Sequence, residues 1–111
     1  MHIPDSDQCN FIRNEVELRQ YTEMGKEERM KLLDRLLWAD EFAKFIGTKF
    51  NTMKRFGLEG LESFIPGMKV MIQQLSEDGC EKVIIGMPHR GRLNMLANVV
   101  YKPLDIIFAE F

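Results

Sequence analysis

Residues 82–94 of this 111-residue chain read KVIIGMPHRGRLN, and they decide which fold class the sequence favours. The run 82–87 is short, almost wholly apolar and rich in β-branched residues, which is typical of a strand covered on both faces, as in a parallel sheet. Residues 88–91 interrupt the run, and apolar side chains at helical spacing follow over about 92–100. The order strand, tight turn, helix predicts an α/β fold with one short buried parallel-type strand.

Before this stretch, the spacing of apolar residues predicts helices. A modest helix is expected at about 7–18, where Ser6 or Asp7 can act as the N-cap. One face of it would carry Cys9, Ile12 and Val16.

A longer helix is expected at about 26–46, preceded by Thr22 or Gly25 and ended by Gly47. Charged residues occupy the side opposite its apolar residues, as in a helix with one buried face. The expected apolar stripe consists of Met30, Leu33, Leu37, Phe42, Phe45 and Ile46.

A third helical stretch, at about 59–76, contains a proline. Its apolar stripe stays in phase through Pro66, so we expect a kinked helix in preference to a break at Ile65. Gly79 is the expected stop. The stripe consists of Leu61, Ile65, Met68, Ile72 and Leu75.

The last predicted helix, at about 103–111, has Pro103 at its first position and is expected to be truncated. A lone strand leaves backbone groups unpaired on both edges, so the chain is expected to be part of something larger. All of it would form one partial domain, 1–111. Its parts would be a helical lead-in at about 5–47, a loop and helix at about 52–78, the strand-turn-helix at about 82–100 and the truncated helix.

Composition indicates a soluble, folded, reduced protein. The chain is 45% hydrophobic and 29% charged, with a formal net charge of -2, so it lacks the basic character of a nucleic-acid-binding protein. No apolar run approaches the ~20 residues that span a bilayer. The first ten residues, MHIPDSDQCN, predict neither a secretory signal nor a transit peptide, and His2 is expected to be exposed and inert. Two separate cysteines favour free thiols.

The candidate chemistry lies where the predicted strand ends. His89, with Arg90 and Arg92 beside it, would stand at the start of the following helix, where unbonded N–H groups attract anions. A carboxylate or a phosphate suits such a site. The alternative is a helix-capping histidine with arginines that pair with surface acids, and the residues by themselves leave both readings open.

A second cluster, residues 54–60, reads KRFGLEG. Arg55 can offer a planar guanidinium to phosphate oxygens, and the glycines allow close backbone approach. The cluster lacks the full glycine pattern and the Lys-Ser/Thr ending of the familiar phosphate loop. Taken alone, the cluster favours a loop that leads into the third helix over a phosphate site.

Together, residues 54–60 and 86–100 resemble the decarboxylating subunit of the 2-oxoglutarate dehydrogenase complex. Residues 3–13 and 102–108 resemble the segments on either side, so the similarity covers nearly the whole chain. The HRGRLN block is highly specific, although the related 2-oxoadipate dehydrogenase subunit shares it. Leu58 in the motif RFGLEG makes the chain more similar to the 2-oxoglutarate branch than to the 2-oxoadipate branch.

The resemblance implies an oxidoreductase of transketolase-like fold that binds thiamine diphosphate and Mg²⁺ and works as a homodimer. Such an enzyme decarboxylates 2-oxoglutarate in the tricarboxylic acid cycle and passes the succinyl group to a lipoyl-bearing succinyltransferase core, with dihydrolipoyl dehydrogenase as a further partner. The resemblance assigns cofactor binding to Arg55, and it assigns substrate recognition in the active centre to His89. It places the parent protein in the mitochondrial matrix or in bacterial cytoplasm.

The family's metal ligands and its second active-centre histidine are expected beyond the end of this chain, and no metal ligand is assigned within it. The chain alone is therefore expected to be inactive. A rival interpretation is a non-catalytic helical interaction module, in which faces rich in Phe and Met dock a partner and residues 89–92 form a basic surface loop.

Overall fold

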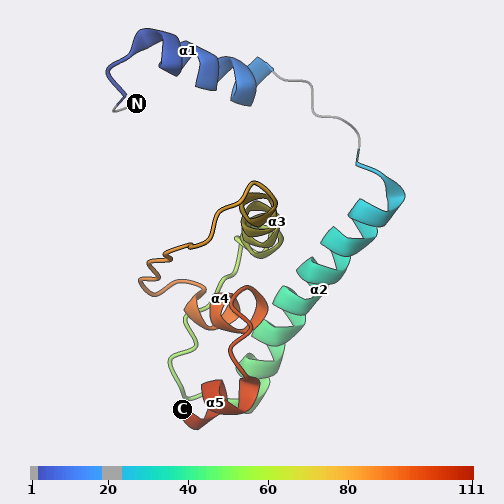
Figure 1. Ribbon diagram of the computed structural model, residues 1–111. Helices are drawn as coiled ribbons and strands as arrows, with labels where there is room; N and C mark the ends of the chain where they lie inside the picture. The colour runs from blue at the N-terminus through green and yellow to red at the C-terminus, as the bar shows by residue number, and fades with distance from the viewer. Residues whose placement is uncertain (1–2, 19–23) are drawn as a thin grey trace.

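The computed structural model describes residues 3–18 and 24–111, so His2 and Thr22 lie outside it. The described part is mostly helical, and no strand occurs in it (Figure 1). Its elements are α1 (Ser6–Arg13), the π-helical turn η1 (Asn14–Leu18), α2 (Lys26–Lys49), α3 (Phe64–Glu77), α4 (Arg92–Asn98) and α5 (Leu104–Ala109).

Helix α1 starts one residue earlier than expected because Asp5 is its N-cap. The Asp5 carboxylate accepts hydrogen bonds from the backbone N–H groups of Asp7, at 2.8 Å, and Gln8, at 3.1 Å. Among the described elements, α1 contacts η1 alone. Its expected inner face is therefore uncovered, and Val16 in η1 is 61% exposed.

Helix α2 begins where Gly25 donates its N–H to the Glu28 carboxylate at 2.9 Å. The expected stop at Gly47 is wrong, because the helix continues to Lys49 and ends with the Phe50 N–H bonded to the Ile46 carbonyl. A single glycine weakens a helix without ending it when no left-handed residue follows. The C-terminal half alone is buried, through Ala39, Phe42 and Ile46.

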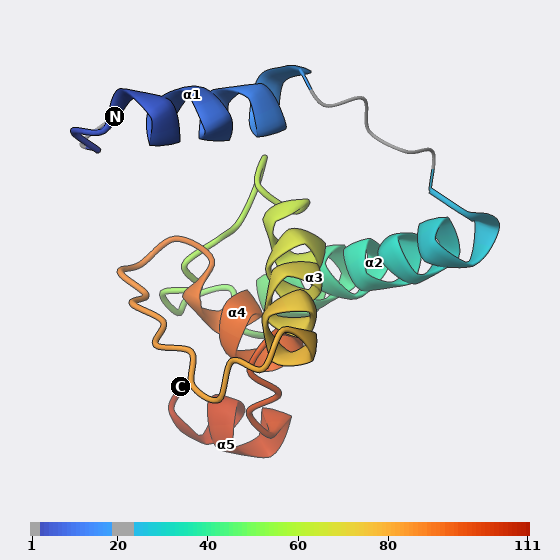
Figure 2. The same cartoon turned by 45° about the horizontal axis from the view of Figure 1, so that its top comes forward.

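The N-terminal half of α2 extends away from the body of the molecule (Figures 1 and 2). Its expected stripe is wrong there, since Met30, Leu33 and Leu37 are about half exposed or more. Helical spacing shows that these residues share a face, whereas only packing decides whether that face is covered.

Helix α3 starts at Phe64, so the predicted kinked helix from 59 is wrong. Pro66 lies in the first turn, where a backbone N–H has no intrahelical partner to lose. Residues 58–63 form tight turns instead. The predicted stop is confirmed: Gly79 has φ +86° and the Cys80 N–H bonds to the Leu75 carbonyl at 2.8 Å.

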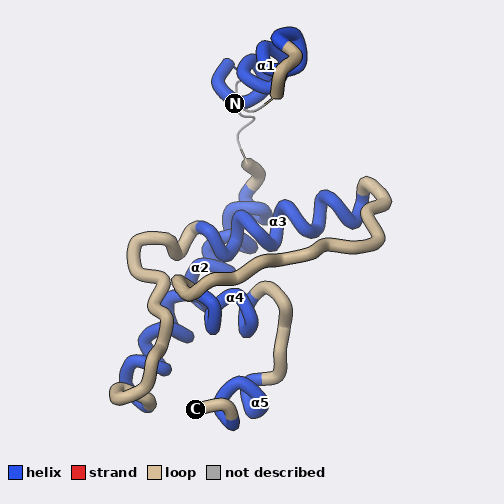
Figure 3. The backbone as a smooth tube through the Cα atoms, turned by 90° about the vertical axis from the view of Figure 1, so that its left-hand side faces the viewer, coloured by secondary structure: helices blue, strands red, loops and turns tan. Residues whose placement is uncertain are grey.

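The predicted buried strand at 82–87 is absent: the segment is an extended loop that runs back beside α3 (Figure 3). A strand exists only where a neighbouring strand pairs with it, and no described segment does so. Burial alternates here, since Ile85 and Met87 pack on the core while Ile84 is 89% exposed. The segment thus has one buried face, and the expectation of two is wrong for this chain.

Helix α4 is central and packs against α2, α3 and α5. It ends at Asn98, earlier than expected, and Val99 is buried in place of Val100, which is 49% exposed. Two groups of buried side chains meet around it: Ala39, Leu58, Ile65, Met95 and Val99 in one, and Phe42, Ile46, Leu93 and Ile107 in the other.

Helix α5 contributes Ile107 to the second buried group. Pro103 is its N-cap and not, as predicted, its first helical residue. Ile107 is 1% exposed, and the Phe108 ring stacks on that of Phe50 with centroids 5.3 Å apart. Within residues 3–18 and 24–111, every helix is too short or too polar to cross a membrane.

Candidate functional site

The two clusters predicted from sequence adjoin one another through backbone hydrogen bonds. The Gly91 N–H donates to the Phe56 carbonyl at 2.8 Å and lies 3.2 Å from the Gly57 carbonyl. The Arg90 guanidinium donates to the Glu59 carbonyl at 2.5 Å. Segment 55–60 and turn 88–91 therefore form one continuous surface, although a whole helix separates them in the sequence.

Gly91 is the residue that makes this close approach possible. It is the N-cap of α4 with φ +72°, a conformation that L-residues rarely adopt. A Cβ at this position would lie 2.4 Å from Cδ1 of Leu58, which is itself buried. Both the backbone angle and the space require glycine.

The His89 side chain is exposed and held by two neighbours. Its ring stacks on that of Phe56, with centroids 5.5 Å apart and planes 16° apart. Nη2 of Arg92 lies 3.4 Å from His89 Nδ1. A guanidinium has N–H donors and no acceptor, so in any hydrogen bond here Nδ1 would be the acceptor.

Arg92 stabilises turn 88–91 through hydrogen bonds to backbone carbonyls at its start. Its guanidinium donates to the carbonyl oxygens of Met87, at 3.3 Å, and Pro88, and it stands over the Phe56 ring at 5.1 Å. These contacts restrain the backbone on which His89 is mounted. The sequence had grouped Arg92 with the anion-binding residues, but its contacts give it a positioning role as well.

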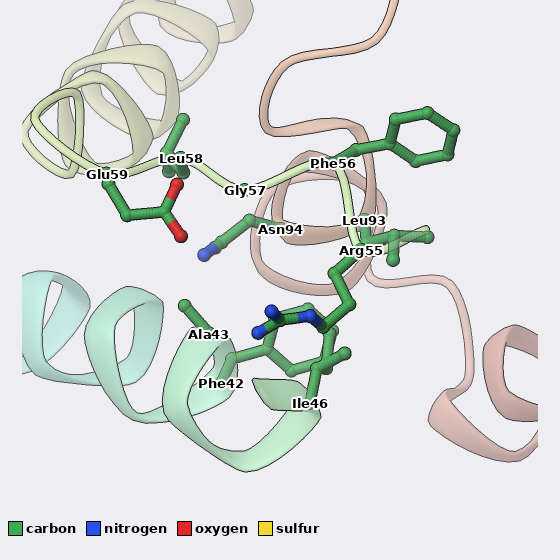
Figure 4. A pocket seen from close by; sticks show the side chains of 10 residues that line it. All are labelled: Phe42, Ala43, Ile46, Arg55, Phe56, Gly57, Leu58, Glu59, Leu93 and Asn94. Atoms are coloured by element: carbon green, nitrogen blue, oxygen red, sulfur yellow. The ribbon is translucent and has the colours of Figure 1, made fainter. Parts of the chain in front are cut away.

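Arg55 points toward α2, whereas the neighbouring Phe56 points away from it (Figure 4). Arg55 and the His89 pair thus occupy different sides of the same segment. Gly47 makes room for Arg55, since a Cβ there would lie 2.7 Å from Arg55 Nη1. A larger residue at position 47 would therefore require the Arg55 side chain to move.

Arg55 borders a pocket of about 20 Å³, with room for about one water. Arg55 makes no hydrogen bond or ion pair to another residue of the described ranges, so its N–H groups remain available. The pocket is lined by Phe42, Ala43, Ile46, Arg55, Phe56, Gly57, Leu58, Glu59, Leu93 and Asn94 (Figure 4).

Asn94 is a residue whose importance the sequence analysis missed. It is 5% exposed, and its Nδ2 donates to the Ala39 carbonyl of α2 at 2.7 Å. Its Oδ1 accepts from Nδ2 of Asn98 at 2.7 Å. Asn94 therefore fastens α4 to α2 beside the pocket, and its place next to Leu93 on the inward side of a helix was the available signal.

The charges around the site are mainly positive and come from Arg55, Arg90 and Arg92. Nearby on α2, the hydrogen bonds that Lys44 donates to Asp40 and Glu41 raise the pKa of this exposed lysine. No cluster of three or more His, Cys, Asp or Glu side chains suited to a metal occurs in residues 3–18 and 24–111. The candidate site thus carries several cationic side chains.

No protein-family model matches the chain. Individual proteins are nevertheless similar to it over its whole length. The chain is 55% identical over 111 residues to the mitochondrial 2-oxoglutarate dehydrogenase of Dictyostelium discoideum. It is 46% identical over 110 residues to that of Saccharomyces cerevisiae, and 49% identical over 111 residues to a mitochondrial 2-oxoglutarate dehydrogenase-like protein of Xenopus laevis.

Each of these alignments covers 99–100% of this chain but 11% of the relative. The relatives are named mitochondrial, which agrees with the mitochondrial location that the resemblance implies. Identity at this level over the whole chain reflects common descent. Over its whole length the chain is similar to 2-oxoglutarate dehydrogenases, and it spans 11% of the length of the relatives that it matches.

Proposed function

We propose that this chain is the part of a thiamine-diphosphate-dependent 2-oxoglutarate dehydrogenase subunit that supplies two anion-binding groups. Arg55 would bind the cofactor diphosphate, and His89 would bind a carboxylate of the substrate. The observation that carries the proposal is the Gly91 to Phe56 hydrogen bond, because it joins the segments that bear these two residues.

The surroundings of Arg55 fit a diphosphate. Its guanidinium is exposed, has no described hydrogen-bond partner and lies in the space that Gly47 leaves. A planar guanidinium can contact two phosphate oxygens at once. The Mg²⁺ that accompanies the diphosphate would take its ligands from elsewhere in the parent subunit.

The surroundings of His89 fit a carboxylate. With Nδ1 facing Arg92, Nε2 is the ring nitrogen left for a ligand, and the stack on Phe56 fixes the plane of the ring. When bound, thiamine diphosphate supplies the thiazolium ring that accepts the electron pair as carbon dioxide leaves. The role of His89 would be to orient the dicarboxylate for that step.

The remaining expectations are part of the same proposal. Residues 1–111 would be a partial domain of a transketolase-like α/β fold, in which segment 82–87 becomes a strand once parent strands pair with it. The parent would be a homodimer in the mitochondrial matrix. Its partners would be a lipoyl-bearing succinyltransferase core and dihydrolipoyl dehydrogenase.

Two substitutions in the full-length parent test the assignment. His89→Ala should lower kcat/KM for 2-oxoglutarate about 10- to 100-fold, the cost of a hydrogen bond to a charged group, with little change in cofactor affinity. Arg55→Ala should weaken thiamine diphosphate binding by a similar factor. Arg29→Ala, on the exposed part of α2, is the control.

Steady-state kinetics and cofactor titration separate the two roles. Equal loss of substrate handling and cofactor binding in His89→Ala would contradict its role, and an unchanged cofactor requirement in Arg55→Ala would remove Arg55 from the site. The same assay with 2-oxoadipate distinguishes the two related substrates, because the proposal requires the larger kcat/KM for 2-oxoglutarate.

A further inference from the structure

A second pocket, of about 220 Å³, lies away from the candidate site, between α2, α3 and the end of α4. Figure 2 shows these three helices meeting in the body of the molecule. The pocket is lined by Arg35, Lys69, Ile72, Gln73, Val99 and Tyr101. Apart from Val99, these residues lie outside segments 54–60 and 86–100.

The pocket is positively charged. Arg35 and Lys69 line it, and no acidic side chain does. Neither cation forms an ion pair with a carboxylate of the described residues. Two cations that share a pocket repel each other, so a doubly charged anion between them would be favoured.

Neighbouring groups orient both cations. Gln73 donates its amide N–H to Glu77 at 3.0 Å, which leaves the Gln73 carbonyl oxygen facing Arg35 Nη2 at 3.5 Å. This long contact occupies one of the five N–H donors of Arg35. The Lys69 ammonium lies 4.6 Å from the centre of the Tyr101 ring.

Tyr101 is held in an unusual backbone conformation. Its φ is +58°, which glycine adopts easily and tyrosine rarely, and the next residue is fixed by the Lys102 N–H bond to the Leu96 carbonyl at 2.8 Å. This angle brings the aromatic ring over Lys69. Strained residues of this kind concentrate at binding sites.

We propose that this pocket binds a phosphate dianion, either inorganic phosphate or the phosphate group of a small monoester. Arg35 would supply a planar pair of donors and Lys69 a compact charge, the two modes by which proteins bind phosphate. A volume of about 220 Å³ accommodates a phosphate together with several waters, since about 15 Å³ of such space holds one water.

The test is a titration of the ¹⁵N-labelled chain with sodium phosphate at pH 7.5, followed by amide chemical shifts. We expect saturable shifts at residues 69–73 and 99–102 with a Kd of about 1 mM. Arg35→Gln and Lys69→Met should each weaken binding about tenfold, the cost of one charge-assisted contact. Lys69→Met keeps the length of the side chain over Tyr101 and removes its charge.

A control variant distinguishes binding in this pocket from a general effect of net charge. Arg29→Gln, the same charge change on an exposed part of α2, should leave the affinity unchanged. Methyl phosphate should bind as phosphate does if a monoester fits, whereas failure of methyl phosphate alone would restrict the site to the free ion and overturn the monoester source. Unsaturable shifts with phosphate, or equal affinity in well-folded Lys69→Met, would overturn the proposal.

Discussion

Gly91 shows at the scale of one residue how two distant motifs are joined. Its N–H reaches the Phe56 carbonyl because no side chain separates the two backbones, and Leu58 fills the space beside it. A glycine in the sequence predicts conformational freedom in general. Here it is required by a positive φ and by a buried neighbour at the same time.

Gly91→Ala should therefore destabilise the chain by about 2–4 kcal/mol, from the left-handed backbone and the overlap with Leu58. Urea denaturation followed by circular dichroism measures this change. Gly67→Ala is the matched control, because a Cβ there meets nothing within 4 Å and the residue lies inside α3. That control should stabilise the chain by about 0.5–1 kcal/mol, and a comparable loss in both variants would contradict the argument.

Asn94 illustrates a buried polar residue that links two helices. Asn94→Ala should lower the free energy of unfolding by about 1–3 kcal/mol, because the α4–α2 hydrogen bond is lost and the partly buried Asn98 amide loses its acceptor. Asn10→Ala, on the exposed face of α1, should change it by less than about 0.5 kcal/mol. Similar changes in the free energy of unfolding for the two variants, measured by urea titration, would show that Asn94 does not link α4 to α2.

Among the elements, α2 has two halves with different roles. The residues from Ala39 onward pack against α4 and the aromatic rings around α5, whereas the first three turns have an apolar face that no described element covers. The spacing of apolar residues is the same in both halves of α2. The halves differ only in whether other elements pack against their apolar face.

This difference predicts unequal costs for equal truncations in α2. Ile46→Ala should destabilise the chain by about 2–5 kcal/mol, because Ile46 is 3% exposed. Leu37→Ala, at a position that is 51% exposed, should change stability by less than about 0.5 kcal/mol. Thermal melts of the two variants provide the measurement, and a large loss in Leu37→Ala would mean that another element covers this face.

At the scale of the whole molecule, the chain is more extended than a closed domain. Its radius of gyration is 17.1 Å, against about 13 Å for a compact domain of this length. Helix α1, the first half of α2 and segment 82–87 all present apolar residues to solvent. These surfaces are what a segment of a larger subunit would leave uncovered.

The proposed function then makes a prediction for the molecule as a whole. Calorimetric titration of thiamine diphosphate with Mg²⁺ should show no binding to residues 1–111, since the described residues contain no metal-ligand cluster. A longer polypeptide that includes the parent's metal ligands should bind both. Failure of the longer polypeptide would favour the helical interaction module instead.

Local chemistry in the sequence determined where helices form and some of their ends. The spacing of apolar residues located the helices, and Gly79 ended α3 as predicted, because these effects act over a few neighbouring residues. Motif identity similarly indicated Arg55 and His89 as candidates, and their roles remain predictions.

Only the tertiary structure decided which of these patterns would be buried, paired or joined. Segment 82–87 has the composition of a strand, but a strand needs a partner that no local pattern supplies. The junction of Gly91 with Phe56, the burial of Asn94 and the exposure of Leu37 depend likewise on which distant segments come into contact. Such contacts arise from packing between elements, so their effects cannot be derived from the order of neighbouring residues.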